Sequence, residues 1–213
     1  MSVPAVLAIG ALFAVGGAAA ERLASVWPAR GAQGRRPGAR TVGLALVSAA
    51  AAAAVAARSM LPWWATAIYL GLLALMVVLV ATDLEQHRLP HMLLDPLIVL
   101  AALFVPFNPA VSPLSAVVGG LSAVALLGLL AIVVRGGLAR GDLYLVLPIG
   151  LVLGFPAVFT AVFAAAFLTS AVSLVLLARR RVGMRTYIPF GPFLVAGTVI
   201  ALILDPRVLA SLR

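Results

Sequence analysis

Residues 62–83 read PWWATAIYLGLLALMVVLVATD, a run of 21 uncharged residues that ends in an aspartate, Asp83. A helix needs about 20 consecutive apolar residues to cross the hydrocarbon core of a bilayer. We therefore expect a transmembrane helix over residues 61–82, with an ionisable side chain at its end.

Apolar runs of similar length recur along the whole chain. Of the 213 residues, 64% are hydrophobic and 10% are charged, and the mean hydropathy is +1.21. A soluble domain with a wetted surface does not reach such values. The sequence therefore predicts an all-α, polytopic integral membrane protein of about eight transmembrane helices, one of them short or half-spanning. The apolar runs lie at 3–20, 41–57, 61–82, 92–107 (interrupted by Asp95), 111–134, 143–154 (the short one), 157–178 and 188–204.

All fifteen basic residues are arginines, and the net charge is +9. Arginines gathered in one surface patch would indicate nucleic acid binding, but these fall in short loops between apolar runs. This distribution is typical of topology signals and of contacts with lipid phosphates. We therefore expect membrane lipid, and not nucleic acid, around the basic loops.

The arginines also predict how the helices thread through the membrane. No positive charge precedes the first apolar run and five arginines follow it, so we expect a retained first helix whose N-terminus lies outside. Eight spans from that start place Arg58, Arg207 and Arg213 outside and the other twelve arginines in the cytoplasm. The same threading brings Asp83, at the end of the third span, and Asp142, at the start of the sixth, to the cytoplasmic face.

The acidic residues are few, and two of them stand out. Glu21 and Asp205 stand beside arginines at span ends and are expected to be solvated, while Asp95, which precedes a proline, is expected to cap a helix. Asp83 and Asp142 instead lie at the mouths of apolar runs, where an ionisable group is costly and so indicates a function. Taken singly, each could also form an interfacial ion pair with a nearby arginine.

Two carboxylates that converge at one membrane face have a chemical use. Like charges a few ångströms apart do not both ionise easily, so one holds a proton while the other activates water for attack on a peptide carbonyl. The chain has no cysteine, and no serine lies in a nucleophile-elbow pattern. His87 and His91 are spaced i, i+4, but Pro90 interrupts any helix between them, so we expect no metal site and no cofactor.

Helix dipoles predict which carboxyl group holds the proton. Asp83 ends one helix and Asp142 begins another, so the partial charges of the two helix termini act in opposite senses. They disfavour ionised Asp83 and favour ionised Asp142, each by roughly 0.3–1 kcal/mol. The hypothesis is that Asp83 carries the shared proton and Asp142 activates water, within a pair that titrates as a unit.

Three segments resemble motifs of the prepilin peptidases, the membrane aspartic peptidases also called type IV leader peptidases. Residues 82–97, TDLEQHRLPHMLLDPL, are similar to the family's first catalytic motif, in which an aspartate ends a helix and a polar loop with Leu-Pro precedes the next helix. Residues 139–145, ARGDLYL, are similar to its G-x-G-D-x-K motif, and residues 188–194, IPFGPFL, to the opening of its final helix. Together the three segments indicate a resemblance over about residues 61–204.

The resemblance implies an aspartic endopeptidase that cleaves the basic leader from type IV pilin-like precursors at the cytoplasmic face of the bacterial inner membrane. It implies that Asp83 and Asp142 are the catalytic pair, and that the partners are the leader of a prepilin or pseudopilin and its hydrophobic helix. Gly141 would allow the backbone to approach the pair and the bound peptide closely. The other substrate-binding residues would be those that break the start of the last helix and leave backbone groups for an extended peptide: Pro189, Phe190, Gly191 and Pro192.

Departures from the family pattern leave an alternative open. Ala139 and Tyr144 stand where the family has glycine and lysine, so a catalytically inactive relative that serves pilus assembly competes with an active peptidase. Larger family members carry a cysteine-bearing methyltransferase insert after the first helix, where this chain has only the basic loop 28–38. We therefore expect an N-terminal helix pair over 1–60, a peptidase core over 61–205, and no methyl transfer.

Two other membrane functions compete with the peptidase. A proton-coupled transporter would be favoured by a carboxylate near the middle of the membrane and by an internal repeat of the spans, and the sequence gives neither signal. A presenilin-type intramembrane protease also uses a Gly-Asp motif, but its Pro-Ala-Leu element is not found near the last helix, where Pro-Phe-Gly-Pro occurs instead.

The threading predicts the reactivity of a single cysteine introduced into this cysteine-free chain. Gln33→Cys, in the basic loop after the first helix, should be shielded from a membrane-impermeant thiol reagent added outside the cell, because the split of the arginines places that loop in the cytoplasm. Labelling before and after permeabilisation of the cells measures this accessibility. Rapid labelling from the periplasmic side would show that the threading is wrong.

Overall fold

The computed structural model describes residues 1–27, 36–133, 139–180 and 188–205. Every regular element within these residues is a helix, which confirms the all-α fold expected from the sequence, and each apolar run corresponds to one α-helix. The elements are α1 (Val3–Ala24), α2 (Ala39–Arg58), α3 (Trp63–Gln86), α4 (His91–Phe104), the 3₁₀ helix η1 (Val105–Phe107), α5 (Pro113–Val133), α6 (Arg140–Leu153), α7 (Ala157–Ala178) and α8 (Gly191–Leu204).

Five of these helices, α1, α2, α3, α5 and α7, are long and apolar enough to cross a membrane. The other three, α4, α6 and α8, have 14 residues each, or about 21 Å of helix against the roughly 30 Å of a bilayer core. The sequence predicts only one short helix. The apolar runs overestimate the lengths of α4 and α8. Pro106 and Pro189 are apolar and are counted in these runs, but they lie outside the regular α-helices.

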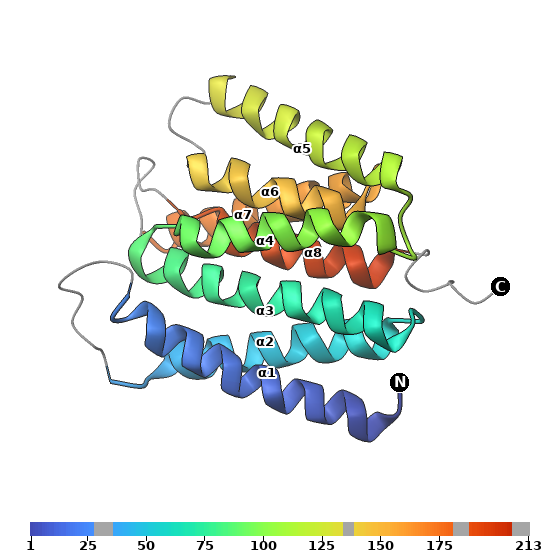
Figure 1. The fold of residues 1–213 in the computed structure, drawn as a ribbon. Helices are drawn as coiled ribbons and strands as arrows, with labels where there is room; N and C mark the ends of the chain where they lie inside the picture. Colours follow the sequence, from blue (N-terminus) through green and yellow to red (C-terminus); the bar gives the residue numbers. More distant parts are fainter. Residues whose placement is uncertain (28–35, 134–138, 181–187, 206–213) are drawn as a thin grey trace.

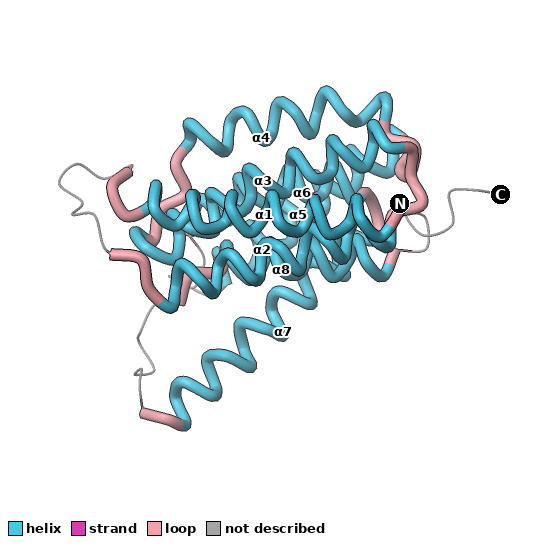
Figure 2. Tube along the Cα trace, turned by 90° about the horizontal axis from the view of Figure 1, so that it is seen from below, coloured by secondary structure: helices cyan, strands magenta, loops and turns pink. Residues whose placement is uncertain are grey.

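The helices run up and down, each antiparallel to the next (Figure 1). The pair α1 and α2 lies along one edge of the bundle and α5 along the opposite edge, with α3, α4, α6 and α8 between them. Helix α7 packs on α8 and diverges from the other helices when the bundle is seen from below (Figure 2). As a result, the N-terminus and the end of α8 lie at one end of the bundle, and α3 ends at the other, where α6 and α8 begin.

Seven of the eight described arginines gather at one end of the bundle, and Arg58 lies at the other end, beside the N-terminus. The threading predicted from the charges expects these seven arginines on one side and Arg58 on the other. The remaining arginines, in 28–35, 134–138, 181–187 and 206–213, lie outside the described residues. The end of the bundle opposite the N-terminus, which we call the arginine-rich end, holds Arg22, Arg36, Arg40, Arg88, Arg140, Arg179 and Arg180.

Helices α5 and α6 pack through glycines, with no room for a side chain between them. A methyl group placed on Gly119 would lie 2.6 Å from the backbone carbonyl carbon of Gly154, and one placed on Gly150 would lie 2.6 Å from the Cα atom of Gly120. Lipid provides little hydrophobic force between helices, so they associate through close van der Waals contact of this kind. The glycines thus hold α6, which carries Asp142, against α5.

A buried polar contact links α3, the end of η1 and α6 at the end of the bundle opposite the arginine-rich end. The Tyr69 hydroxyl donates a hydrogen bond to Asn108 Oδ1 (3.1 Å), and Asn108 Nδ2 donates to the carbonyl oxygen of Val152 (3.2 Å). Buried polar groups are stabilising only when paired in this way. The contact sets the spacing of α3 and α6, the two helices whose other ends carry Asp83 and Asp142.

The prediction that Asp95 caps a helix is wrong. Helix α4 begins at His91, four residues earlier, and Pro96 lies inside it. Pro90 is the N-cap, since its fixed φ suits the chain just before a helix. The Asp95 side chain is 67% exposed and lies one helical turn from His91, with Oδ1 3.4 Å from the His91 Nδ1 atom.

The prediction that Glu21 and Asp205 are solvated is also wrong. The two residues are 7% and 5% exposed. Helix α1 continues past its apolar run to Ala24, so Glu21 lies within the helix and faces α2, where its Oε2 atom accepts a hydrogen bond from Thr41 Oγ1 (2.7 Å). Packing of α1 against α2 therefore buries Glu21.

The glycine packing predicts the effect of a single methyl group. Gly119→Ala should lower the free energy of unfolding by about 1–3 kcal/mol, because the methyl group would meet the backbone of Gly154. Gly128→Ala, on the same helix with nothing within 4 Å of the added carbon, should be neutral or stabilise by up to about 1 kcal/mol. Denaturant-induced unfolding of both variants in micelles measures the difference, and equal stabilities would contradict the packing argument.

Candidate active site

Asp83 lies in the last turn of α3. The helix continues to Gln86, and His87 ends it in the left-handed conformation (φ 52°, ψ 41°), donating its backbone N–H to the Asp83 carbonyl oxygen (2.9 Å). Asp83 is 4% exposed, and its Oδ2 atom has no hydrogen-bond partner among the described residues. An orphaned carboxyl oxygen costs stability, so this side chain has the features of a functional group.

Asp142 is the third residue of α6 and is 1% exposed. Its Oδ2 atom accepts a hydrogen bond from the backbone N–H of Ala139, the N-cap residue, at 3.1 Å. The carboxylate therefore folds back on the first turn of α6, where the positive end of the helix dipole stabilises negative charge.

Gly191, the first residue of α8, brings the two carboxyl groups into one site. A side-chain carbon placed on Gly191 would lie 2.6 Å from Asp83 Oδ2 and 3.7 Å from Asp142 Oδ1. The two aspartates, which come from different helices, thus face one point. Any other residue at this position would push its Cβ atom into the Asp83 carboxyl, which gives a physical reason for a glycine here.

A pocket of about 520 Å³ opens beside the pair at the arginine-rich end, a volume within the usual range of roughly 300–1,000 Å³ for ligand pockets. Its walls come from the end of α3, the loop before α4 and the start of α6. The lining residues are Asp83, His87, Arg88, Leu89, Pro90, His91, Ala139, Arg140, Gly141 and Tyr144. Asp83 itself lines the pocket, whereas Asp142 is buried behind the lining residues Ala139, Arg140 and Gly141.

The other predicted site residues lie around the pair in different roles. A side chain on Gly141 would meet Leu89 at 3.0 Å, so its close approach is to the loop after α3 and not to the carboxyl groups. Phe190 is buried as the N-cap of α8, and Pro192 in the first turn starts this helix where the sequence predicts a break. Pro192 lines a second pocket, between α2, α3 and α8, while Pro189 is half-buried just before the cap.

Sequence reasoning missed much of the pocket lining. His87 and His91 are considered above only as metal ligands, whereas both line the pocket, and among the described residues no group of three or more His, Cys, Asp or Glu side chains could hold a metal ion. Tyr144 is half-exposed at the pocket, and its ring packs edge-on against His91 with centroids 5.0 Å apart. The spacing in the sequence could have placed His87 near the site, since this residue lies one helical turn after Asp83.

Comparison with known proteins indicates the family of this chain. Residues 70–174 match the model of the type IV leader peptidase family, a segment that includes both aspartates. The chain is also 28% identical over 145 residues to the prepilin leader peptidase/N-methyltransferase of Vibrio cholerae, an alignment that covers 65% of this chain and 56% of that relative. The chain thus spans little more than half the length of that relative. No solved structure gives a significant match.

Proposed function

Because the chain belongs to the type IV leader peptidase family, we propose that it is a membrane aspartic endopeptidase that removes the leader peptide from type IV pilin-like precursors. The observation that carries this proposal is the convergence of Asp83 and Asp142 beside Gly191, at one end of a bundle of apolar helices. Aspartic peptidases need two carboxyl groups that share one proton. The two buried carboxyl groups beside Gly191, of which Asp83 lines an open pocket, support the proposal.

We assign the proton to Asp83 and the negative charge to Asp142. Asp142 Oδ2 accepts a backbone N–H at the N-terminus of α6, and both the hydrogen bond and the helix dipole favour the charged form. Asp83 lies in the last turn of α3, where the dipole of that helix disfavours a negative charge, and its Oδ2 atom has no partner among the described residues. The backbone N–H of Gly191 at the start of α8 also donates to the Asp83 carboxyl group, so the assignment rests on the termini of α3 and α6. These contacts support the assignment that the helix ends predict.

The reaction follows from this proton arrangement. Asp142 accepts a proton from a water molecule as the water oxygen bonds to the peptide carbonyl carbon, and Asp83 donates its proton to the carbonyl oxygen. Asp142 then gives its proton to the leaving nitrogen as the C–N bond breaks. Asp83 takes a proton back from one hydroxyl of the tetrahedral intermediate, so the pair returns to its starting state.

The geometry at the two departures from the family pattern favours an active enzyme over an inactive relative. Ala139 contributes its backbone N–H to Asp142 at φ −79° and ψ 150°, a conformation that requires no glycine. Tyr144 lies at the pocket wall against His91 and leaves the carboxyl pair in place. Neither substitution removes a contact on which the proposed reaction depends.

We place the site at the cytoplasmic face of the bacterial inner membrane. The arginine-rich end contains the carboxyl pair, and arginines concentrate on the cytoplasmic side of membrane proteins. Large apolar side chains on the outer helices, such as Leu12 of α1 and Phe167 of α7, are exposed in the bundle and suit contact with lipid. The proposed partners are therefore the precursor's leader, its hydrophobic helix and the surrounding lipid.

Substitution of either aspartate tests the proposed function. Asp83→Asn and Asp142→Asn should each reduce cleavage of a co-expressed prepilin at least about 10²-fold, because asparagine keeps the size of the side chain but cannot exchange the proton. Mass measurement of the precursor's N-terminus reports cleavage. Asp95→Asn, which changes an exposed acid on α4, is the matched control and should cleave normally. If either dyad variant is inserted and still cleaves, the aspartic mechanism is excluded.

The short N-terminal region predicts the chemistry of the product. We propose that residues 1–60 form a helix pair with a reduced basic loop, and the chain contains no cysteine. A precursor processed by this protein alone, with a methyl donor present, should therefore keep an unmethylated N-terminus. A mass increase of one methyl group on the mature product in the purified system would overturn this expectation.

A further inference from the structure

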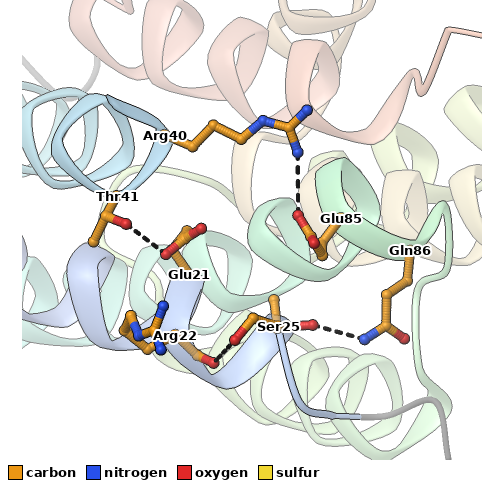
Figure 3. Close-up of polar contacts among 8 residues, drawn as sticks. Glu21, Arg22, Ser25, Arg40, Thr41, Glu85 and Gln86 are labelled. Carbon is orange, nitrogen blue, oxygen red and sulfur yellow. Dashed lines mark hydrogen bonds and ion pairs between the residues drawn. The ribbon is translucent and has the colours of Figure 1, made fainter. Parts of the chain in front are cut away.

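The last turn of α3 is tied to the end of α1. Gln86, the final residue of α3, reaches back so that its Nε2 atom donates hydrogen bonds to the carbonyl oxygens of Ala24 (2.7 Å) and Trp27 (2.9 Å). Figure 3 shows this side chain crossing from α3 to the end of α1. Carbonyl groups at a helix C-terminus lack partners within the helix, and Gln86 supplies one for Ala24, the last residue of α1.

A second set of contacts joins the same turn to α2. Arg40, in the first turn of α2, donates from Nη1 to Glu85 Oε2 at 3.2 Å. Helices α1 and α2 are themselves linked at this level by the buried hydrogen bond between Thr41 and Glu21 (Figure 3). Helices α1 and α2 are therefore bonded to each other and both contact the end of α3.

These contacts matter because of where Asp83 lies. Helix ends fray, and α3 ends at His87 in the left-handed conformation, which is uncommon for residues other than glycine. The Asp83 Oδ2 atom has no hydrogen bond of its own among the described residues. The position of this carboxyl group therefore depends on the backbone of the last turn of α3, three residues from Gln86, together with the backbone of Gly191 that it contacts.

We propose that Gln86 is a positioning residue for catalysis: by binding the end of α1 it fixes the last turn of α3, and with it the Asp83 carboxyl against Asp142. The α1–α2 pair then contributes to the reaction without contacting substrate. The kinetic part of this inference rests on the proposed peptidase function, whereas the fixing of the helix end can be measured without any substrate.

Two substitutions of Gln86 separate positioning from folding. Gln86→Glu keeps the size of the side chain and removes both donors, whereas Gln86→Lys keeps a donor at similar reach. For equal amounts of inserted, folded enzyme, the Glu variant should show a kcat between about tenfold and 100-fold lower at unchanged KM, as expected for a misplaced reacting group. The Lys variant should recover most of the loss. Asp95→Asn, which changes an exposed acid on α4 outside these contacts, should stay close to wild type.

Hydrogen exchange provides the readout that needs no substrate. The backbone amides of residues 84–87 should exchange faster in Gln86→Glu than in wild type, and those of α8 should be unchanged. Unchanged exchange at 84–87 would overturn the proposal, as would a wild-type kcat in the Glu variant or a Lys variant no better than the Glu variant. If the wild-type protein cleaves no precursor, the peptidase function fails, and the exchange measurement alone still decides whether Gln86 fixes the helix end.

Discussion

The cost of burying two carboxyl groups next to each other governs the arrangement of this bundle. Asp83 and Asp142 are 4% and 1% exposed, and both lie next to Gly191. Two negative charges buried next to each other are not sustainable without a shared proton or compensating dipoles. The fold meets this requirement with helix ends, since α6 begins under Asp142 and α8 begins beside both carboxyl groups at Gly191. Asp83 comes from the last turn of α3, and its Oδ2 atom has no hydrogen-bond partner among the described residues.

The remainder of the molecule holds these helix ends at their spacing. A membrane helix gains little from hydrophobic association with its neighbours, so contact geometry and polar links decide how the helices pack. Glycine contacts bring α5 and α6 together, and Asn108 joins α3 to α6 at the far end. At the near end, Gln86 and Glu85 join α3 to the α1–α2 pair. Contacts at both ends of α3, made by residues that are distant in sequence, thus hold the helix that carries Asp83.

Much of this could be predicted from the sequence, because membrane helices and buried acids leave strong local signals. Run length and composition located all eight α-helices of the described residues, and the position of Asp83 and Asp142 at the ends of apolar runs singled them out. Local rules failed where tertiary contacts decide. Asp95 before a proline fits a cap, yet Pro90 starts α4 earlier, and Glu21 beside an arginine is buried because α1 continues against α2. Gln86 carried no local signal, since its role depends on a hairpin some 60 residues away.

The central claim is that the two aspartates act as one catalytic unit, and a double-mutant cycle tests it most directly. Cleavage of the same prepilin would be measured for wild type, Asp83→Asn, Asp142→Asn and the double variant, at equal amounts of inserted protein. Residues that act as a unit are strongly non-additive, so the account predicts that the double variant loses no more activity than the more impaired single variant. A double variant whose loss equals the product of the two single losses would mean that the aspartates act independently, which would contradict the account.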